Sequence, residues 1–246
     1  MEDNKKELSY DVGLKPKEVN LKKSYRFYNR TFIFLFFSNI ILFFSVFLWR
    51  FVGMLMGIKV RNKKYSRKVK GAVVVANHVF QIDAFLNVVH SYPKKTYVTS
   101  LKSNLGFPIV SRYIRLCAAV PIPETRELLR KFNKDSVDIL KKDKRILFYA
   151  EANLIPFSDH IRPFQKGGFK YAVQADKPIL PIVYTYRKPK GIFKWKKNPF
   201  ITINYLPPIY ANKELESYEQ ANELLDRTHK IMSDFFNEHS EIKKTD

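Results

Sequence analysis

Cysteine is nearly absent from this chain, and its scarcity narrows the chemistry available. Among 246 residues there is one cysteine, Cys117, which excludes an internal disulfide framework and a multi-cysteine metal site. Cys117 lies in the apolar stretch 116–120, where a buried and inert thiol is expected. The five histidines, at positions 78, 90, 160, 229 and 239, have no metal-ligand spacing. We therefore expect no metal site and no cofactor.

Acidic residues are also scarce, with 23 Asp and Glu against 44 Lys and Arg, a formal net charge of +21. This balance predicts an anionic partner. One basic cluster, 59–70, directly follows the most hydrophobic segment, where anionic headgroups would lie. A second, 187–197, mixes its lysines with Ile192, Phe193 and Trp195, as at a membrane interface. No zinc-finger, RNA-recognition or basic-zipper signature is present, so we expect membrane lipids and no nucleic acid as partners.

The hydrophobic segment is the expected membrane anchor. Residues 31–49 carry no charge between Arg30 and Arg50, and 51–58 add a second apolar stretch. As a helix, the first stretch would be about 28 Å long, close to the thickness of the bilayer core. It starts too far into the chain, and lacks the cleavage pattern, for a cleaved signal peptide. Because both flanks are basic, a hairpin or shallow anchor bent near Ser38 and Asn39 is favoured over a single span, which stays open.

Strand-like and helix-like stretches alternate from residue 70 to 210, which predicts an α/β layered domain with a largely parallel sheet flanked by helices. The expected strands are 72–76, 96–99, 117–122, 145–150, 179–186 and 201–206. The expected helices are 80–90, 107–115, 124–141, 166–175 and 214–238. We expect four parts: a polar basic tail (1–29), helices of a membrane anchor (30–58), the main domain (59–210) and a C-terminal amphipathic helix (211–246).

His78 and Asp83, which follow the buried strand 72–76, are the candidate catalytic pair. In one continuous helix, residues five apart point roughly 140° away from each other, so the two side chains would not meet. They meet if His78 lies in the turn before the helix and Asp83 in its first turns. A carboxylate on one imidazole nitrogen fixes the tautomer and leaves the other nitrogen to accept a proton. No protein nucleophile accompanies the pair, which points to a hydroxyl of the substrate as nucleophile.

An anchor followed by Asn-His-x-x-x-x-Asp at the end of a first strand resembles the lysophosphatidic acid acyltransferase family of membrane-bound glycerolipid acyltransferases. The resemblance extends over roughly residues 30–210. Its further blocks are 102–109 (KSNLGFPI), 148–153 (FYAEAN), 164–168 (FQKGG) and 178–182 (PILPI). The order of the blocks makes the resemblance more specific than any one motif.

The chain departs from the family pattern where the family has arginines. Many members read Pro-Glu-Gly-Thr-Arg in the third block, whereas here only Glu151 remains, followed by Ala152 and with Leu154 at the arginine position. The arginine that usually ends the second block is also missing. In the family these arginines are thought to grip the acceptor's phosphate, a task that suits a bidentate guanidinium. The candidate substrate-binding residues are Glu151, Lys102, Arg162 and Lys166.

The resemblance implies that His78 is the general base for the acceptor hydroxyl, with Asp83 orienting it, and that a fatty acyl group moves from a thioester to 1-acylglycerol-3-phosphate. The product would be phosphatidic acid. Acyl-CoA or acyl carrier protein would be the donor, at the cytoplasmic face of the cell membrane. Two alternatives stay open: another lysolipid or glycolipid acceptor, and a catalytically inert membrane-bound scaffold.

Overall fold

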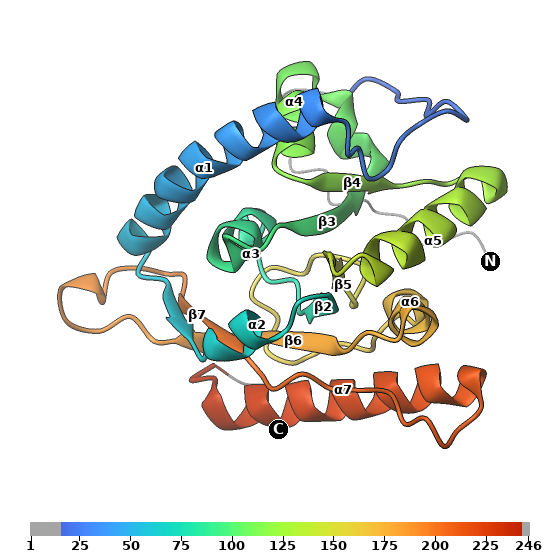
Figure 1. The fold of residues 1–246 in the computed structure, drawn as a ribbon. Helices are drawn as coiled ribbons and strands as arrows, with labels where there is room; N and C mark the ends of the chain where they lie inside the picture. The colour runs from blue at the N-terminus through green and yellow to red at the C-terminus, as the bar shows by residue number, and fades with distance from the viewer. Residues whose placement is uncertain (1–15, 243–246) are drawn as a thin grey trace, which may run out of the picture.

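The computed structural model describes residues 16–242, apart from the side chains of Pro108 and Ile192. Within this range, seven strands form one sheet in the order β1-β7-β6-β2-β5-β3-β4 (Figure 1). They are β1 (Lys59–Arg61), β2 (Ala72–Ala76), β3 (Thr96–Leu101), β4 (Ala119–Ile122), β5 (Arg145–Tyr149), β6 (Ile179–Arg187) and β7 (Phe200–Tyr205). The predicted α/β class is confirmed. Residues 1–15 of the predicted tail and 243–246 lie outside the described residues.

The strand β2 occupies the middle of the sheet. All five of its residues are buried, as expected for a parallel strand covered on both faces. It pairs in parallel with β5 on one side, where Val74 lies opposite Leu147, and with β6 on the other, where Val74 lies opposite Leu180. Among the described pairs only β6 and β7 are antiparallel. The sheet is therefore largely parallel, and the five strands from β6 to β4 end on a common edge.

Helices cover both faces of this sheet (Figure 1). The chain runs outward from β2 through β3 to β4, and returns through β5 to β6. Because parallel crossovers are right-handed, this reversal places α3 and α4 on one face and α5 and α6 on the other. The helices are α1 (Phe32–Leu55), α2 (Lys64–Lys68), α3 (Asp83–Ser91), α4 (Pro108–Leu116), α5 (Arg126–Lys141), α6 (Gly167–Ala175) and α7 (Ser217–His239), with 3-10 turns η1 (Lys102–Gly106) and η2 (Gly191–Phe193). The C-terminal helix α7 packs on α6 and β6.

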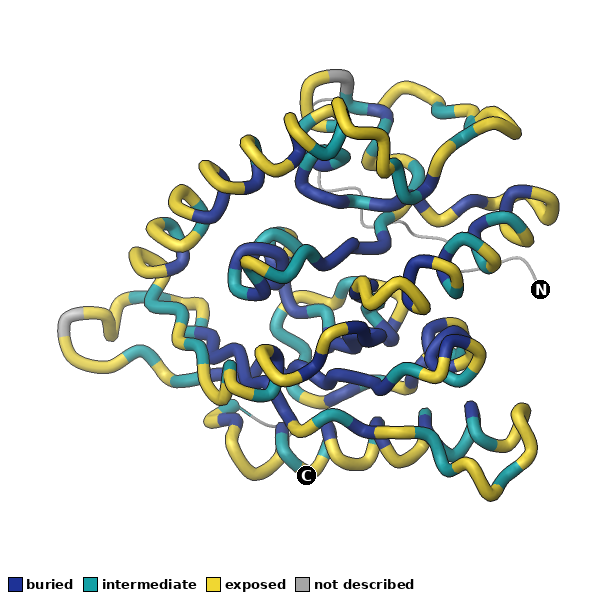
Figure 2. The backbone as a smooth tube through the Cα atoms, viewed as in Figure 1, coloured by how far each residue is buried: buried dark blue, intermediate teal, exposed yellow. Residues whose placement is uncertain are grey.

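The apolar segment forms one continuous helix, α1, so the bend predicted near Ser38 and Asn39 is wrong. The helix lies along α3 and α4 rather than projecting from the domain (Figure 1). Its inner side is buried and its outer side exposed (Figure 2). Ser38 does not bend the helix, because its hydroxyl faces the domain and donates a hydrogen bond to the Leu116 carbonyl.

The basic segment after α1 contains structure that the sequence analysis did not predict. Lys59–Arg61 form β1, which pairs in parallel with β7, and α2 follows directly. Elsewhere the expected strands and helices are present with ends shifted by a few residues. The predicted division into four parts remains a prediction.

Candidate active site

The topology brings the ends of two neighbouring strands together at the carboxyl edge of the sheet. The strand β2 ends at Ala76 and leads into Asn77 and His78, while the neighbouring β5 ends at Tyr149, two residues before Glu151. The chain direction across the sheet reverses around these strands, and ligand sites of open α/β sheets lie at the carboxyl ends of such strands. The candidate residues thus lie where the fold itself favours a site.

His78 and Asp83 meet as their spacing predicts. His78 lies in the loop before α3, and Asp83 is the first residue of that helix. The Nδ1 atom of His78 is 2.8 Å from Oδ2 of Asp83. The same oxygen accepts hydrogen bonds from the backbone amides of Val79 at 3.0 Å and Phe80 at 3.4 Å. Asp83 therefore holds both the imidazole and the backbone of the turn that carries it.

The carboxylate is fully buried, whereas the imidazole is 20% exposed. Because the Asp83 carboxylate can only accept a hydrogen bond, Nδ1 of His78 carries the ring proton and donates the hydrogen bond to Asp83. Within residues 16–242, only Nδ1 of this ring has a hydrogen-bond partner. The Nε2 atom is left as a proton acceptor for a group from outside the protein.

Asn77 and Tyr184, which the sequence analysis did not assign to the site, fix the end of β2. The amide side chain of Asn77 donates to the Tyr184 carbonyl at 3.2 Å and accepts from the Tyr184 amide at 2.8 Å. This exchange continues the pairing of β2 with β6 beyond the last strand residue. The Tyr184 hydroxyl also donates to the backbone carbonyl of Asp83 at 3.2 Å. Both residues therefore fix the positions of the ends of the loop that carries His78.

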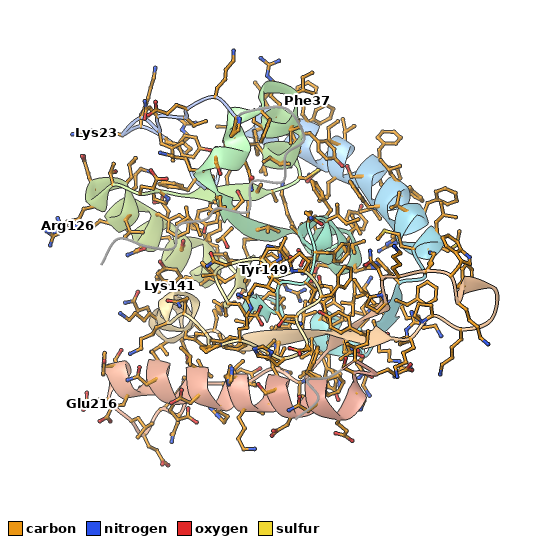
Figure 3. The ribbon with its side chains drawn as sticks, turned by 180° about the vertical axis from the view of Figure 1, so that it is seen from behind. Lys23, Phe37, Arg126, Lys141, Tyr149 and Glu216 are labelled. Carbon is orange, nitrogen blue, oxygen red and sulfur yellow. The ribbon has the colours of Figure 1, made fainter. Side chains whose placement is uncertain are left out.

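Tyr149 forms one wall of the site. Its ring stacks on the His78 imidazole, with centroids 4.0 Å apart and planes inclined by 19°. Figure 3 shows Tyr149 near the centre of the molecule. Burial, together with the nearby Asp83 carboxylate, raises the pKa of Tyr149 well above its usual value, so the phenol stays protonated. Its hydroxyl accepts a hydrogen bond from Asn87 at 3.2 Å. Tyr149 lies opposite Ala76 in the pairing of β5 with β2, and this pairing cannot be read from the sequence.

Glu151 and Arg162 form a largely buried ion pair next to His78. A carboxylate oxygen of Glu151 accepts from Nη2 of Arg162 at 2.7 Å and from the His78 backbone amide at 3.3 Å. The other oxygen accepts from the Arg162 amide at 3.1 Å. The two side chains are 1% and 13% exposed. Glu151 thus pairs with a basic residue and fixes Arg162 beside the histidine.

The loop between β5 and α6, which contains Arg162, packs against the turn that contains His78. Within it, the Phe157 amide donates to the Val79 carbonyl at 3.0 Å. Ala152, at the glycine position of the family pattern, has a φ of +63°, a left-handed conformation that favours glycine. The backbone therefore keeps a glycine-like turn although the residue is alanine.

The other two candidate binding residues have partners of their own. Lys102, at the end of β3 and two strands away from β2, pairs with Glu124 at 2.6 Å. Lys166, just before α6, donates to the Tyr218 hydroxyl of α7 at 3.3 Å. The structure thus brings Glu151 and Arg162 to His78, while Lys102 and Lys166 contact side chains outside that cluster. Their role in binding substrate stays a prediction.

The described residues offer no group of three or more His, Cys, Asp or Glu that could hold a metal ion. Cys117 is buried as expected, and burial raises the pKa of its thiol, which keeps it protonated and unreactive. The site in residues 16–242 thus consists of a histidine positioned as a base, its buried carboxylate, and a fixed guanidinium beside them. Such a set can take a proton from a bound hydroxyl close to a negatively charged group of the substrate.

Comparison with protein families gives a match over the main domain. The family model described as "Acyltransferase" matches residues 57–185, just over half of the chain. A 1-acyl-sn-glycerol-3-phosphate acyltransferase of Limnanthes douglasii is 27% identical over 164 residues, which are 62% of this chain and 54% of that protein. An uncharacterized acyltransferase of Schizosaccharomyces pombe is 29% identical over 183 residues, 71% of this chain and 63% of that protein. The chain spans about half to two thirds of the length of these curated relatives.

A solved structure shares the fold. The 1-acyl-sn-glycerophosphate acyltransferase PlsC of Thermotoga maritima superposes with a TM-score of 0.59 at 17% sequence identity. The match covers 81% of this chain and 80% of that one. At this identity the similarity is one of fold.

Proposed function

The chain belongs to the acyltransferase family, and we propose that it transfers a fatty acyl group from a thioester to the sn-2 hydroxyl of 1-acylglycerol-3-phosphate, forming phosphatidic acid. The observation that carries the proposal is the 2.8 Å contact between Nδ1 of His78 and the buried Asp83 carboxylate, in a cluster that also contains Arg162. The names of the curated relatives support the choice of acceptor.

In this proposal His78 Nε2 takes the proton of the acceptor hydroxyl while that oxygen attacks the thioester carbonyl carbon. The carbon–sulfur bond then breaks, and the leaving thiolate takes the proton from the imidazolium. The products are an ester and a free thiol, with no acyl group attached to the protein. Asp83 stabilises the imidazolium that forms between these steps, and general base catalysis of this kind contributes about 10²–10⁴-fold in rate. The high positive charge of the chain favours an acidic carrier protein or CoA as donor.

Arg162 is the residue we assign to the acceptor phosphate. Its Nη2 binds Glu151, and its Nε is buried without a hydrogen-bond partner in the described residues. A buried guanidinium donor without an acceptor is costly, and an incoming phosphate oxygen would satisfy it. Arg162 would thus replace the arginine that the family pattern places where Leu154 stands here.

We propose that α1 holds this domain on the membrane by lying in one leaflet. Among the described residues, α1 is the helix long and apolar enough to cross a bilayer, with a mean hydropathy of 2.4 over its most apolar window. Its outer face exposes a row of phenylalanines that soluble proteins seldom leave uncovered. They are Phe32, Phe36, Phe37, Phe43, Phe44, Phe47 and Phe51. Figure 3 shows Phe37 at the outer rim of the molecule.

The inner face of α1 argues for a helix in the membrane plane rather than a crossing one. Tyr113 of α4 donates to Ser45 at 2.9 Å and accepts from Trp49 at 2.8 Å, and Arg50 donates to the Val89 carbonyl at 3.1 Å. Together with the bond from Ser38 to the Leu116 carbonyl, these bonds fix both halves of α1 to the domain. A crossing helix would have to break them or carry the charged domain into the hydrocarbon layer, where a charge is costly.

A second candidate function is acyl transfer to a different lysolipid or to a glycolipid. The observation that favours it is the absence of the family arginines at Leu154 and at the end of the second block. An inert scaffold is the third alternative, and the close His78–Asp83 contact argues against it, since a scaffold has no need of that geometry.

The deciding experiment follows both products of the reaction. The full chain in phosphatidylcholine nanodiscs would receive palmitoyl-CoA or palmitoyl-carrier protein together with lysophosphatidic acid, lysophosphatidylcholine, lysophosphatidylglycerol or a glycolipid. Thiol release and the acylated lipid are measured together. Transfer to lysophosphatidic acid in preference to the others supports the proposal. Transfer only to another alcohol supports the second candidate, and no transfer with any donor supports the scaffold.

A further inference from the structure

A cavity of about 430 Å³ lies at the amino-terminal edge of the sheet, on the side of the molecule opposite the histidine turn. Its walls come from α1 and from the segments that lead into β2, β3 and β5. Six basic residues line it: Arg30, Lys70, Lys94, Lys95, Lys144 and Arg145. Its lining in the described chain includes one acidic residue, Asp143, which pairs with Lys177 at 2.7 Å. The cavity therefore gathers positive charge with little to balance it.

This arrangement destabilises the charged form of the two lysines just before β3, Lys94 and Lys95. Burial lowers the pKa of Lys95 to about 8, and the charge of Lys144 adds to the shift. Burial and the charges of Arg145 and Lys70 lower the pKa of Lys94. An ammonium group is least stable where water has been removed and like charges are close. An anion in the cavity would offset both effects, because an opposite charge close by favours the ammonium form.

The basic side chains differ in how they are held. Arg145 is buried and donates to the Ser66 hydroxyl at 2.8 Å and the Lys70 carbonyl at 3.2 Å, so it supplies fixed charge. Lys95 donates to the Ser38 hydroxyl of α1 at 2.6 Å, which uses one of the three donors of its ammonium group. Arg30, Lys70 and Lys144 are exposed at the rim. Fixed charge inside and long side chains at the rim suit a multivalent anion such as a phosphate.

This cavity is separate from the candidate active site. Lys70 precedes β2 and His78 follows it, eight residues further along an extended chain. At about 3.3 Å per residue the two positions are roughly 25 Å apart. A phosphate bound here cannot belong to an acceptor whose hydroxyl reaches His78.

The place of the cavity beside α1 indicates the source of the phosphate. Leu35 and Asn39 of α1 contribute to its wall. Asn39 is three residues from Phe36 and four from Phe43, both exposed on the outer face, and such spacings make neighbours on a helix. The α1 wall of the cavity thus adjoins the apolar surface that we assign to the membrane.

We propose that this cavity is a second phosphate-binding site, which takes the phosphate of an anionic membrane lipid and so holds the first half of α1 at the bilayer surface. The assignment to a lipid rests on the in-plane placement of α1 proposed above. The assignment to a phosphate rests on the cavity and its basic residues alone.

The test uses the full chain labelled with ¹³C at lysine Cε, in neutral detergent micelles. The Lys95 signal is identified by its loss in Lys95→Arg. Dioctanoyl phosphatidic acid, dioctanoyl phosphatidylcholine and inorganic phosphate are titrated separately, and the Lys95 signal is followed. Arg30→Gln/Lys70→Gln/Lys144→Gln removes three rim charges, while Arg130→Gln/Lys134→Gln/Lys170→Gln removes three equal charges from exposed positions on α5 and α6.

We expect phosphatidic acid to shift the Lys95 signal saturably and to raise the pKa of Lys95. Each basic residue near an anionic headgroup contributes about fivefold in affinity, so the rim variant should bind on the order of 100-fold more weakly, and the control variant about as well as the unchanged protein. Arg162→Gln should leave the shift of the Lys95 signal unchanged. This result would distinguish phosphatidic acid bound in the cavity from phosphatidic acid bound as product beside His78.

Two results would overturn the phosphate site: no saturable shift with any phosphate, or equal weakening in the rim and control variants. Inorganic phosphate that binds as tightly as phosphatidic acid, with the same dependence on the rim residues, would support the phosphate site and overturn its assignment to a lipid.

Discussion

Replacing Asp83 by asparagine removes one negative charge from beside His78 and changes little else. In the present structure Oδ2 of Asp83 accepts from Nδ1 of His78 and from the amides of Val79 and Phe80. The side-chain oxygen of an asparagine in the same place can accept all three bonds, so the turn before α3 should keep its shape. The expected loss is therefore electrostatic, and it should appear in the reaction rate rather than in the fold.

Its magnitude follows from the geometry. Two unit charges about 4 Å apart interact by about 4 kcal/mol at an effective dielectric constant of about 20. In the proposed reaction the imidazolium exists only once His78 has taken the acceptor's proton, so the lost attraction raises the barrier. At about 1.4 kcal/mol for each factor of ten, we expect Asp83→Asn to lower kcat on the order of 1,000-fold. The KM values for donor and acceptor should change little.

The assay compares thiol release by the unchanged protein, Asp83→Asn, His78→Ala and the double variant. Because both residues act on one proton transfer, the double variant should be no slower than His78→Ala. Thermal unfolding of Asp83→Asn within a few degrees of the unchanged protein is the control for folding. A rate within tenfold of the unchanged protein, or two effects that simply multiply, would refute the reasoning.

Three further predictions concern the loop, the anchor and the acceptor. Ala152→Gly relieves a left-handed conformation at φ +63°, so the free energy of unfolding should rise by about 0.5–1 kcal/mol in chemical denaturation; a decrease would contradict this. Phe43→Ser/Phe47→Ser should weaken binding to phosphatidylcholine vesicles by roughly 30-fold in flotation assays, because each ring contributes about 1 kcal/mol of apolar contact from its exposed part. Unchanged flotation would exclude this face as the membrane contact. Arg162→Gln should raise the KM for lysophosphatidic acid by about 10- to 100-fold with the KM for the donor unchanged, and Arg162→Lys should restore part of the loss; equal changes in both KM values would point to a structural role.

The central part of the fold could be predicted because its signals are local. The strand β2 is an unbroken run of apolar residues, which is typical of a strand buried on both faces. The spacing of His78 and Asp83 allows the two side chains to meet if the histidine lies in the turn before the helix. The position at the carboxyl edge of a parallel sheet then follows from the alternation of strands and helices. These inferences need no knowledge of which strands are neighbours.

The remainder of the site depends on strand order, which the sequence does not reveal. Tyr149 reaches the histidine because β5 lies next to β2, and Asn77 finds its partner because β6 lies on the other side. The ion pair of Glu151 with Arg162 joins residues eleven apart across an irregular loop, where no periodicity guides prediction. The missed contacts thus depend on strand order and on an irregular loop, and neither can be read from the sequence.

The bend in the anchor was mispredicted for a related reason. Because both flanks of residues 31–49 are basic, the sequence favoured a segment that bends near Ser38 and Asn39. In the structure Ser38 and Ser45 bond to the domain along one continuous helix. Likewise Lys59–Arg61 reads as part of a basic cluster until its pairing with β7 makes it a strand.

The most direct test of the account is the rate of acyl transfer with His78→Ala beside the unchanged protein in the same phosphatidylcholine nanodiscs. Palmitoyl-CoA and lysophosphatidic acid serve as substrates, and phosphatidic acid and free CoA are measured together. We expect equal amounts of both products from the unchanged protein and a loss of at least about 1,000-fold in His78→Ala, with membrane binding unaltered. Transfer that persists in His78→Ala at a comparable rate would show that His78 is not the base.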